Sequence, residues 1–331
     1  MVLLVAFLVL VGGVVAAGAY YGSCQGASGA RNPVAFTVRR GMAGEQVVER
    51  LHDLGVIRCG GFVGRILLRG TGKADQILAG DYRLTTNMRF DDAIDVLTTP
   101  PTPVPTVRLT IPEGYRLTQI AERVHAVLGI SQERFLASAE RTAWTLPPYL
   151  PAGHGTEGFL FPKTYDFVKA DTGPDDVVRR LLDQFDTEAK VLPWKNTERL
   201  GVSPYEVVTI ASMIEREARV ASDRPKIAAV IYNRLAAGMT LGIDATLLYD
   251  DPTPDGQLSA SDLRSNSPYN TRVHAGLPPT PIASPGLPSL RAALSPADVP
   301  YLHYVLCGAD GHHRFSVNYS TFLHDKAVCL G

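Results

Sequence analysis

Two glutamates near the end of a predicted helix over residues 203–220 have the chemistry and spacing that acid–base catalysis requires. With about 100° of rotation per residue, one face of this helix is apolar: Val207, Ile210, Ala211, Ile214, Ala218 and Ala221. Glu217 lies roughly 60° from the centre of that face, and Glu215 lies about 100° from it on the opposite flank. Partial burial disfavours the ionised carboxylate and raises its pKa, which suits a general acid near neutral pH. The alternative is that both glutamates pair with neighbouring arginines on a solvated face.

The following helix ends in polar residues that could line a cleft. It is predicted over residues 224–237 and carries Asn233 and Arg234 near its end, and Asp244 follows in the sequence Asp-Ala-Thr. Polar side chains that gather just past a helix end can hold a ligand. Arginine and aspartate at such positions also serve as ordinary helix and turn caps, so the sequence leaves both interpretations open.

A loop rich in proline and glycine offers a second group of candidate binding residues. Tyr269, Asn270 and Thr271 place an aromatic ring, an amide and a hydroxyl side by side. These groups suit a sugar, because the ring can stack on its apolar face while the amide and hydroxyl bond its hydroxyl groups. The alternative is a rigid loop whose polar side chains cap its own turns.

The composition and the motifs argue against several other kinds of site. Lys and Arg number 32 against 33 Asp and Glu, for a net charge of -1, so no overall positive field would hold nucleic acid. Cys-x-x-Cys, His-Glu-x-x-His and P-loop patterns are all missing from the sequence, so we expect no metal and no cofactor. The four cysteines allow three pairings, and the sequence does not choose among them. Outside the cytoplasm, a Cys307–Cys329 disulfide is compatible with the sequence.

The first residues of the chain predict a membrane segment. Residues 2–19 are uncharged and apolar, and Tyr20 and Tyr21 follow them. A helix of about 18 to 20 apolar residues spans a bilayer core, and tyrosines commonly mark its interface. We therefore expect a single-pass anchor over residues 1–21 and the rest of the chain outside the cytoplasm; a cleaved signal peptide is the alternative. Residues 22–33, rich in glycine, serine and alanine, predict a linker.

A sequence repeat suggests a small module after the linker. Phe-Thr-Val-Arg-Arg-Gly at residues 36–41 and Leu-Thr-Ile-Pro-Glu-Gly at 109–114 each precede an amphipathic helical pattern, and a looser copy begins at residue 80. Two strands flanking two helices would form a module over residues 34–99. The proline-rich stretch at 99–105 predicts a boundary.

Residues 106–331 alternate helical patterns with long polar loops. A strand pair is expected over 301–306 and 314–317, and residues 251–287 show almost no periodicity. The predicted helices span 117–128, 131–140, 174–189, 203–220, 224–237 and 288–294.

Motifs spread along nearly the whole chain resemble the endolytic murein transglycosylases of the YceG-like family. They are Glu-Gly-Phe-Leu-Phe-Pro at 157–162, Ala-Ser-Met-Ile-Glu-Arg-Glu at 211–217, Tyr-Asn-Arg-Leu at 232–235, Gly-Met-Thr-Leu at 238–241, Asp-Ala-Thr at 244–246, Pro-Tyr-Asn-Thr at 268–271 and Gly-Leu-Pro-Pro at 276–279. The family more commonly has Asp-Pro-Thr where this chain has Asp-Ala-Thr, which bears on the rigidity of that loop. The resemblance implies an N-terminal transmembrane helix, a LysM-like module over 34–99 and a mixed α+β catalytic domain over 106–331.

The resemblance also implies an activity and roles for residues. Members of the family cut nascent peptidoglycan strands between N-acetylmuramic acid and N-acetylglucosamine and leave a 1,6-anhydro end. The family's catalytic glutamate matches Glu217; Glu215 is the second candidate, and Glu157 and Asp244 are candidates for electrostatic support. The residues implied for holding the glycan are Asn233, Arg234, Tyr269 and Asn270, and Thr271 is implied to support the loop of this binding site.

Two alternative functions and a cellular setting accompany this interpretation. The chain could be a non-catalytic peptidoglycan-binding protein on the membrane, or a muramidase that hydrolyses the same bond with a second carboxylate. The resemblance implies a location in the inner (plasma) membrane, with the catalytic domain on the extracytoplasmic side. The expected partners are peptidoglycan glycan strands, the membrane and peptidoglycan synthases, and no nucleic acid.

Overall fold

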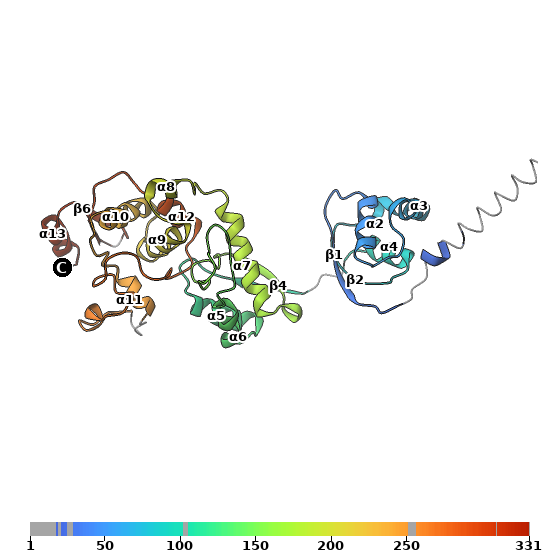
Figure 1. Cartoon of the computed structure of the whole chain (residues 1–331), viewed down its shortest axis with the longest axis horizontal. Coiled ribbons are helices and arrows are strands. Elements are labelled where there is room, and N and C mark those ends of the chain that lie inside the picture. The colour runs from blue at the N-terminus through green and yellow to red at the C-terminus, as the bar shows by residue number, and fades with distance from the viewer. Residues whose placement is uncertain are drawn as a thin grey trace, which may run out of the picture. The chain divides into compact units, whose positions relative to one another are not determined.

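The chain forms two compact units, Met1–Val104 and Pro105–Gly331. A computed structural model describes residues 18, 21–24, 29–101, 105–250, 256–308 and 310–330 (Figure 1). The expected anchor over residues 1–21 lies almost entirely outside these ranges. Within them, no helix is both long enough and apolar enough to cross a membrane.

The N-terminal unit is a two-stranded sheet covered by helices (Figure 1). β1 (Pro33–Val38) and β2 (Gly80–Thr85) pair antiparallel, with Phe36 opposite Tyr82. Both rings are buried in the core of the unit. The helices are α2 (Gly44–Asp53), α3 (Gly61–Thr71) and α4 (Phe90–Thr98), and a 3-10 turn spans Ala74–Gln76.

The sequence analysis missed α3 in this unit. Its sequence contains Gly61, Gly64 and Gly70, and glycine disfavours a helix interior. Gly64 is nevertheless required, because a Cβ there would lie 2.5 Å from a methyl carbon of Val48 on α2. Along the chain, α2 and α3 therefore lie between the two strands, and α4 follows β2. The LysM-like nature of this unit stays a prediction.

The C-terminal unit is mostly helical, with two small strand pairs, so the expected mixed α+β class is confirmed. β3 (Thr106–Thr110) pairs with β4 (Thr164–Val168), and β5 (His303–Leu306) pairs with β6 (His313–Ser316), both antiparallel. The helices predicted from the sequence all form, within a few residues at their ends: α5 (Leu117–Leu128), α6 (Gln132–Ala139), α7 (Pro174–Ala189), α9 (Pro204–Glu217), α10 (Arg224–Ala236) and α12 (Leu287–Leu294).

Several elements of this unit were not predicted. They are β4 and the helices α8 (Asn196–Leu200), α11 (Asp244–Asp250) and α13 (Tyr319–Leu330). α8 and α11 are too short for a helical period to be visible. The apolar residues of α13 do not gather on one face of the helix, so its sequence shows no helical period. Short 3-10 turns lie at Lys169–Asp171, Ala221–Asp223 and Asp262–Arg264.

Helix α9 forms the centre of the C-terminal unit. Every residue from Val207 to Ile214 is buried, and the helix packs against α10 and α12 (Figure 1). Its first turn is fixed by a capping box, in which Ser203 Oγ accepts from the Glu206 amide at 3.2 Å and Glu206 Oε2 accepts from the Ser203 amide at 2.7 Å. A helix anchored at its start and buried along its length holds its last residue, Glu217, in a fixed position.

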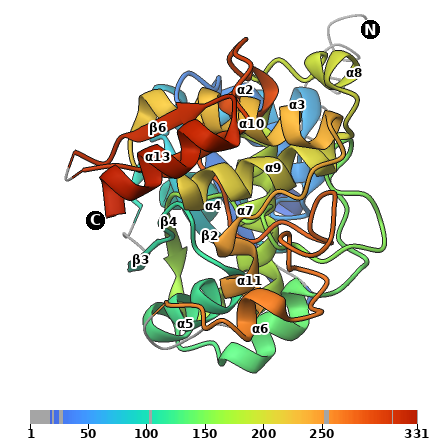
Figure 2. The same cartoon turned by 90° about the vertical axis from the view of Figure 1, so that its left-hand side faces the viewer.

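Two disulfides join the four cysteines, one in each unit. Cys24 pairs with Cys59, and Cys307, which directly follows β5, pairs with Cys329 near the end of α13. α13 packs against β5 and β6, and Figure 2 shows it beside β6. An ion pair between Arg314 on β6 and Asp325 on α13, at 3.2 Å, adds to this contact.

Removal of the second disulfide should destabilise the C-terminal unit. The bridge closes a loop of sequence separation 22, for which the loss of unfolded-state entropy predicts about 3 kcal/mol. We expect the Cys307→Ser/Cys329→Ser double variant to lose about that much free energy of unfolding in urea under non-reducing conditions. The Cys24→Ser/Cys59→Ser variant is the matched control, because its bridge lies in the other unit. Equal unfolding of the C-terminal unit in wild type and the first variant would contradict the prediction.

Candidate active site

Glu217 is the last residue of α9 and is partly buried. Its Oε2 accepts a hydrogen bond from the Tyr304 hydroxyl at 3.1 Å. Burial raises the pKa of Glu217 to about 7, and the nearby Asp244 charge also raises it, against the lowering effects of the Tyr304 bond and of Arg272 and Arg216. The negative end of the α9 dipole disfavours a carboxylate there as well. The carboxyl group can therefore both give and take a proton near neutral pH.

Glu215 has a different environment and makes an internal ion pair. Its side chain is only 7% exposed and lies 3.4 Å from the Arg224 guanidinium, which also donates to Ser289 Oγ at 3.0 Å. The other carboxylate oxygen accepts from the Gly286 amide at 3.0 Å. The alternative interpretation of ion pairing with an arginine thus holds for Glu215, at an enclosed rather than a solvated position. Glu215 links α9 to the starts of α10 and α12.

Glu157 is a second carboxyl group with a raised pKa. It is almost fully buried, and burial raises its pKa to about 7. Oε2 accepts from the Leu117 amide at 3.0 Å and from the Tyr249 hydroxyl at 3.2 Å, while Oε1 is buried without a partner among the described residues. Because Leu117 is the first residue of α5, this carboxyl group satisfies the start of that helix.

Helix α11 connects the surroundings of Glu157 and Glu217. Its first residue, Asp244, acts on the charge of Glu217, and Tyr249 near its end bonds Glu157. Asp244 is about half-exposed and pairs with Arg272, with 2.7 Å between Oδ1 and Nε. A small cavity of about 90 Å³ lies beside α11 and is lined by Arg116, Arg216, Ala245, Leu248, Tyr249, Gly256 and Ile282. Its lining includes direct sequence neighbours of Glu217 and Asp244.

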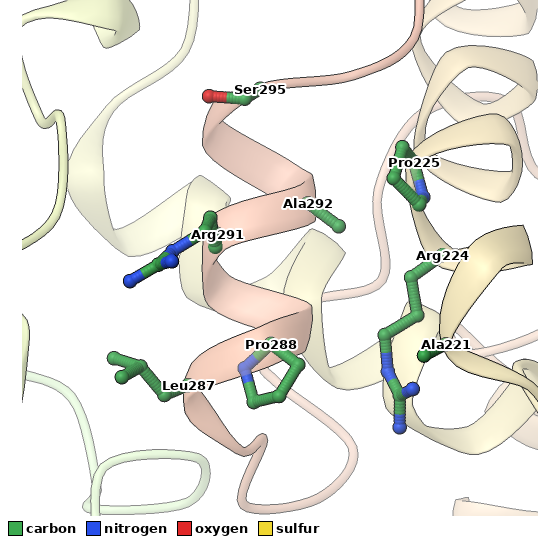
Figure 3. Close-up of a pocket in the computed structure, with 8 residues that line it drawn as sticks. All are labelled: Ala221, Arg224, Pro225, Leu287, Pro288, Arg291, Ala292 and Ser295. Carbon is green, nitrogen blue, oxygen red and sulfur yellow. The ribbon is translucent and has the colours of Figure 1, made fainter.

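A larger cavity of about 440 Å³ lies on the Glu215 side of the unit (Figure 3). Pro288 and Ala292 of α12 face Pro225 and Arg224 across it, and Glu217 is not part of its lining. Its walls are mostly apolar, and the guanidinium of Arg224 is already bonded to Ser289 and Glu215. We therefore place the candidate active site at Glu217 and not in this cavity. Within the described ranges, no cluster of His, Cys, Asp and Glu is arranged to hold a metal ion.

Comparison with known proteins agrees with the resemblance seen in the sequence. The YceG-like family model matches residues 36–328. This chain belongs to the YceG-like family. An endolytic murein transglycosylase of Bacillus subtilis (strain 168) is 35% identical over 263 residues, which cover 75% of this chain and 71% of that protein.

Two further relatives have lower sequence identity to this chain. The endolytic murein transglycosylase of Streptococcus pneumoniae (strain ATCC BAA-255 / R6) is 30% identical over 278 residues, 76% of this chain but only 50% of that protein. The crystal structure of the yceG-like protein lmo1499 from Listeria monocytogenes has a TM-score of 0.61 and 28% identity, and the match covers 90% of this chain and 100% of that one.

The YceG-like Tyr-Asn-Arg-Leu motif on α10 is bonded to the protein itself. Asn233 Nδ2 donates to the carbonyls of Val299 and Tyr301, each at 2.9 Å. Arg234 donates to the carbonyls of Leu302 and Leu241, each at 2.6 Å. Asn233 thus holds the backbone that leads into β5, and Arg234 joins that backbone to Leu241; contact of either side chain with a glycan stays a prediction.

The Pro-Tyr-Asn-Thr loop contains two enclosed polar residues and one partly exposed tyrosine. Asn270 is fully buried and donates to the carbonyls of Leu263 and Ser265, and buried Thr271 Oγ1 accepts from the Ile243 amide at 3.0 Å. Both side chains are enclosed and bond within the protein, so Thr271 supports this loop, and contact of Asn270 with a glycan stays a prediction. Tyr269 is partly exposed, its hydroxyl bonds Thr280 Oγ1 at 2.8 Å, and it stays a candidate for contact with a sugar.

Sequence analysis missed Tyr304, the direct partner of Glu217. The two residues are 87 positions apart, and Tyr304 lies on a short strand whose pattern only indicated β structure. The periodicity of a sequence does not predict a contact between the end of a helix and a strand far along the chain. An isolated tyrosine in an apolar strand was the available signal, since a buried hydroxyl normally has a partner.

Loss of the Glu215 carboxylate should affect stability more than chemistry. In Glu215→Gln the largely enclosed Arg224 loses its counter-ion, so we expect the free energy of unfolding to fall by about 3 kcal/mol. Activity per folded molecule should fall only in part. The Glu215→Gln/Arg224→Gln double variant, which removes both charges, should recover some stability in the same urea titrations. Complete loss of activity in a folded Glu215→Gln protein would contradict this role.

Proposed function

We propose that the chain is an endolytic lytic transglycosylase. It cuts peptidoglycan strands between N-acetylmuramic acid and N-acetylglucosamine and leaves a 1,6-anhydro end, with Glu217 as the catalytic residue. The observation that carries this proposal is the partly buried carboxyl group of Glu217, whose pKa is raised to about 7 at a fixed helix end. Membership of the YceG-like family and relatives named endolytic murein transglycosylases support the same activity.

One carboxyl group suffices for this reaction when it is used twice. Protonated Glu217 donates its proton to the glycosidic oxygen as the carbon–oxygen bond breaks and an oxocarbenium-like state forms. The resulting carboxylate then accepts the proton of the muramyl C6 hydroxyl while that oxygen bonds to C1. The proton returns to Glu217, no water is consumed, and the strand is cut into two products.

Hydrolysis is the second candidate, because Asp244 lies near enough to act on the charge of Glu217 and is half-exposed. A hydrolase would need Asp244 as nucleophile or to activate water. Its pairing with Arg272 at 2.7 Å favours an electrostatic role instead. Glu157 is less suited to either task, since it is buried at the start of α5.

The cellular setting is part of the same proposal. Residues 1–21 would anchor the chain in the plasma membrane as a single span, with the catalytic unit outside the cytoplasm. The LysM-like module would bind glycan, and peptidoglycan synthases would supply the nascent strands. The support is the apolar run of residues 2–19 and the family resemblance; two disulfides suit an oxidising compartment.

The masses of the products test the reaction and the catalytic residue together. Wild-type protein should release fragments from uncrosslinked glycan strands whose new ends are one water lighter than hydrolysed reducing ends. Glu217→Gln should still bind strands but release none, whereas Asp244→Asn should keep the anhydro product at a reduced rate. Glu157→Gln is the matched variant for the other carboxyl group with a raised pKa, which is buried at the start of α5. Hydrolysed ends, or full activity of Glu217→Gln, would reject the proposal.

The pH dependence follows from the raised pKa of Glu217. The first step needs the protonated acid, so kcat/KM should fall about tenfold per pH unit once the pH exceeds the pKa. That limb should lie near pH 7. Initial rates on purified strands across a pH series would give the profile. A profile that stays level well above pH 7 would contradict the role of Glu217 as the acid.

A further inference from the structure

We propose that Tyr304 is a positioning residue that fixes which oxygen of Glu217 carries the catalytic proton, and that Asn233 and Arg234 act through it by holding β5. This inference rests on the proposed function, since it assigns roles around the same carboxyl group. It gives the family motif on α10 a purpose other than contact with the glycan.

The two oxygens of the Glu217 carboxyl group have different surroundings. Tyr304 donates to Oε2 at 3.1 Å, and no described residue bonds Oε1. An oxygen that already accepts a hydrogen bond is the poorer site for a proton, so the acidic proton belongs on Oε1. Oε1 is therefore the oxygen left to meet the glycosidic bond. After the proton is given away, the Tyr304 bond becomes charge-assisted and stabilises the carboxylate.

The Tyr304 hydroxyl stays a hydrogen-bond donor to Glu217 during the whole reaction. Burial and the neighbouring Glu217 raise the pKa of Tyr304 well above its ordinary value, so its hydroxyl keeps its proton at any pH at which the enzyme works. The charged or titratable groups that face this pair are Asp244 from α11, Arg272 from the loop after it, Arg216 from α9, Arg234 from α10 and His313 from β6.

Strand β6 fixes the Tyr304 ring. Tyr304 pairs in register with Phe315, and the His313 ring meets it edge-on with 5.4 Å between centroids. His313 is fixed in turn by Asp223, a fully buried carboxylate that accepts from the His313 amide at 2.7 Å and lies 3.2 Å from its Nδ1. The ring therefore has little freedom to turn its hydroxyl away from Glu217.

Side chains of α10 attach β5 to that helix. Asn233 and Arg234 bond the carbonyls of Val299, Tyr301 and Leu302, and Arg234 Nη2 lies 3.1 Å from Nδ1 of His303. These bonds end at the residue before Tyr304. They fix the backbone from which the tyrosine projects, so loss of either side chain would move the hydroxyl without touching the glycan.

The test is the pH profile of Tyr304→Phe in the full-length protein. This variant keeps the ring and its packing but removes the donor, so the pKa of Glu217 should rise and the upper limb of kcat/KM should move about one unit to higher pH. We expect kcat to fall about tenfold to a hundredfold with KM little changed, as for a lost hydrogen bond to a charged group. Tyr319→Phe removes an exposed hydroxyl on α13 and should match wild type.

Arg234→Lys supplies a second and independent measurement. Lysine cannot reproduce the fork of guanidinium bonds, so the variant should shift the limb in the same direction. In the Tyr304→Phe background it should shift the limb no further, because both act through one hydroxyl. A wild-type profile in folded Tyr304→Phe, or additive shifts in the double variant, would overturn this inference. Activity in Glu217→Gln, measured alongside, would instead overturn the proposed function.

Discussion

Desolvation of one carboxyl group at the end of a buried helix is the constraint around which the C-terminal unit is arranged. An ionised glutamate loses hydration there, and the negative end of the helix dipole adds to the cost, so the pKa of Glu217 is raised to about 7. The opposing charges of Asp244 and of nearby arginines keep that effect within the range in which a proton can move both ways. Neither property would last if α9 could shift, which explains the capping box at its start and the apolar packing along its length.

The neighbouring glutamates show that burial alone does not define a catalytic acid. Glu215 is enclosed but holds an arginine, and Glu157 is buried but satisfies the start of α5. Glu217 differs from both, because it meets neither an arginine nor a backbone amide and its one hydrogen bond comes from the Tyr304 hydroxyl. Three carboxyl groups in one unit thus serve as an ion-pair partner, a helix cap and a proposed acid, according to the group that each one meets.

Local signals in the sequence predicted much of the fold. The apolar spacing gave α9, although its predicted end at residue 220 lies three residues beyond Glu217, and the same kind of periodicity gave α5, α7, α10 and α12. The helical wheel also singled out Glu217 at the edge of the apolar face. These features depend on residues within one or two turns of each other, so a single sequence is sufficient to find them.

Features that depend on distant residues could not be predicted in this way. Asn270 and Thr271 have the chemistry of a sugar site, and only the packed loop reveals that they are enclosed. Tyr304 reaches Glu217 across 87 positions, and the choice of cysteine partners depends on the packing of α13 over the β5–β6 pair. Such contacts arise from tertiary packing and leave no periodic trace.

The bridge between Cys307 and Cys329 has a consequence for when this molecule becomes competent. Thiols stay reduced in the cytosol and oxidise in extracytoplasmic compartments. The cross-link tethers the end of β5, three residues beyond the tyrosine that contacts Glu217, to the terminal helix. A freshly made copy among reducing thiols therefore lacks that tether, and the strand that carries Tyr304 is joined covalently to α13 only after oxidation.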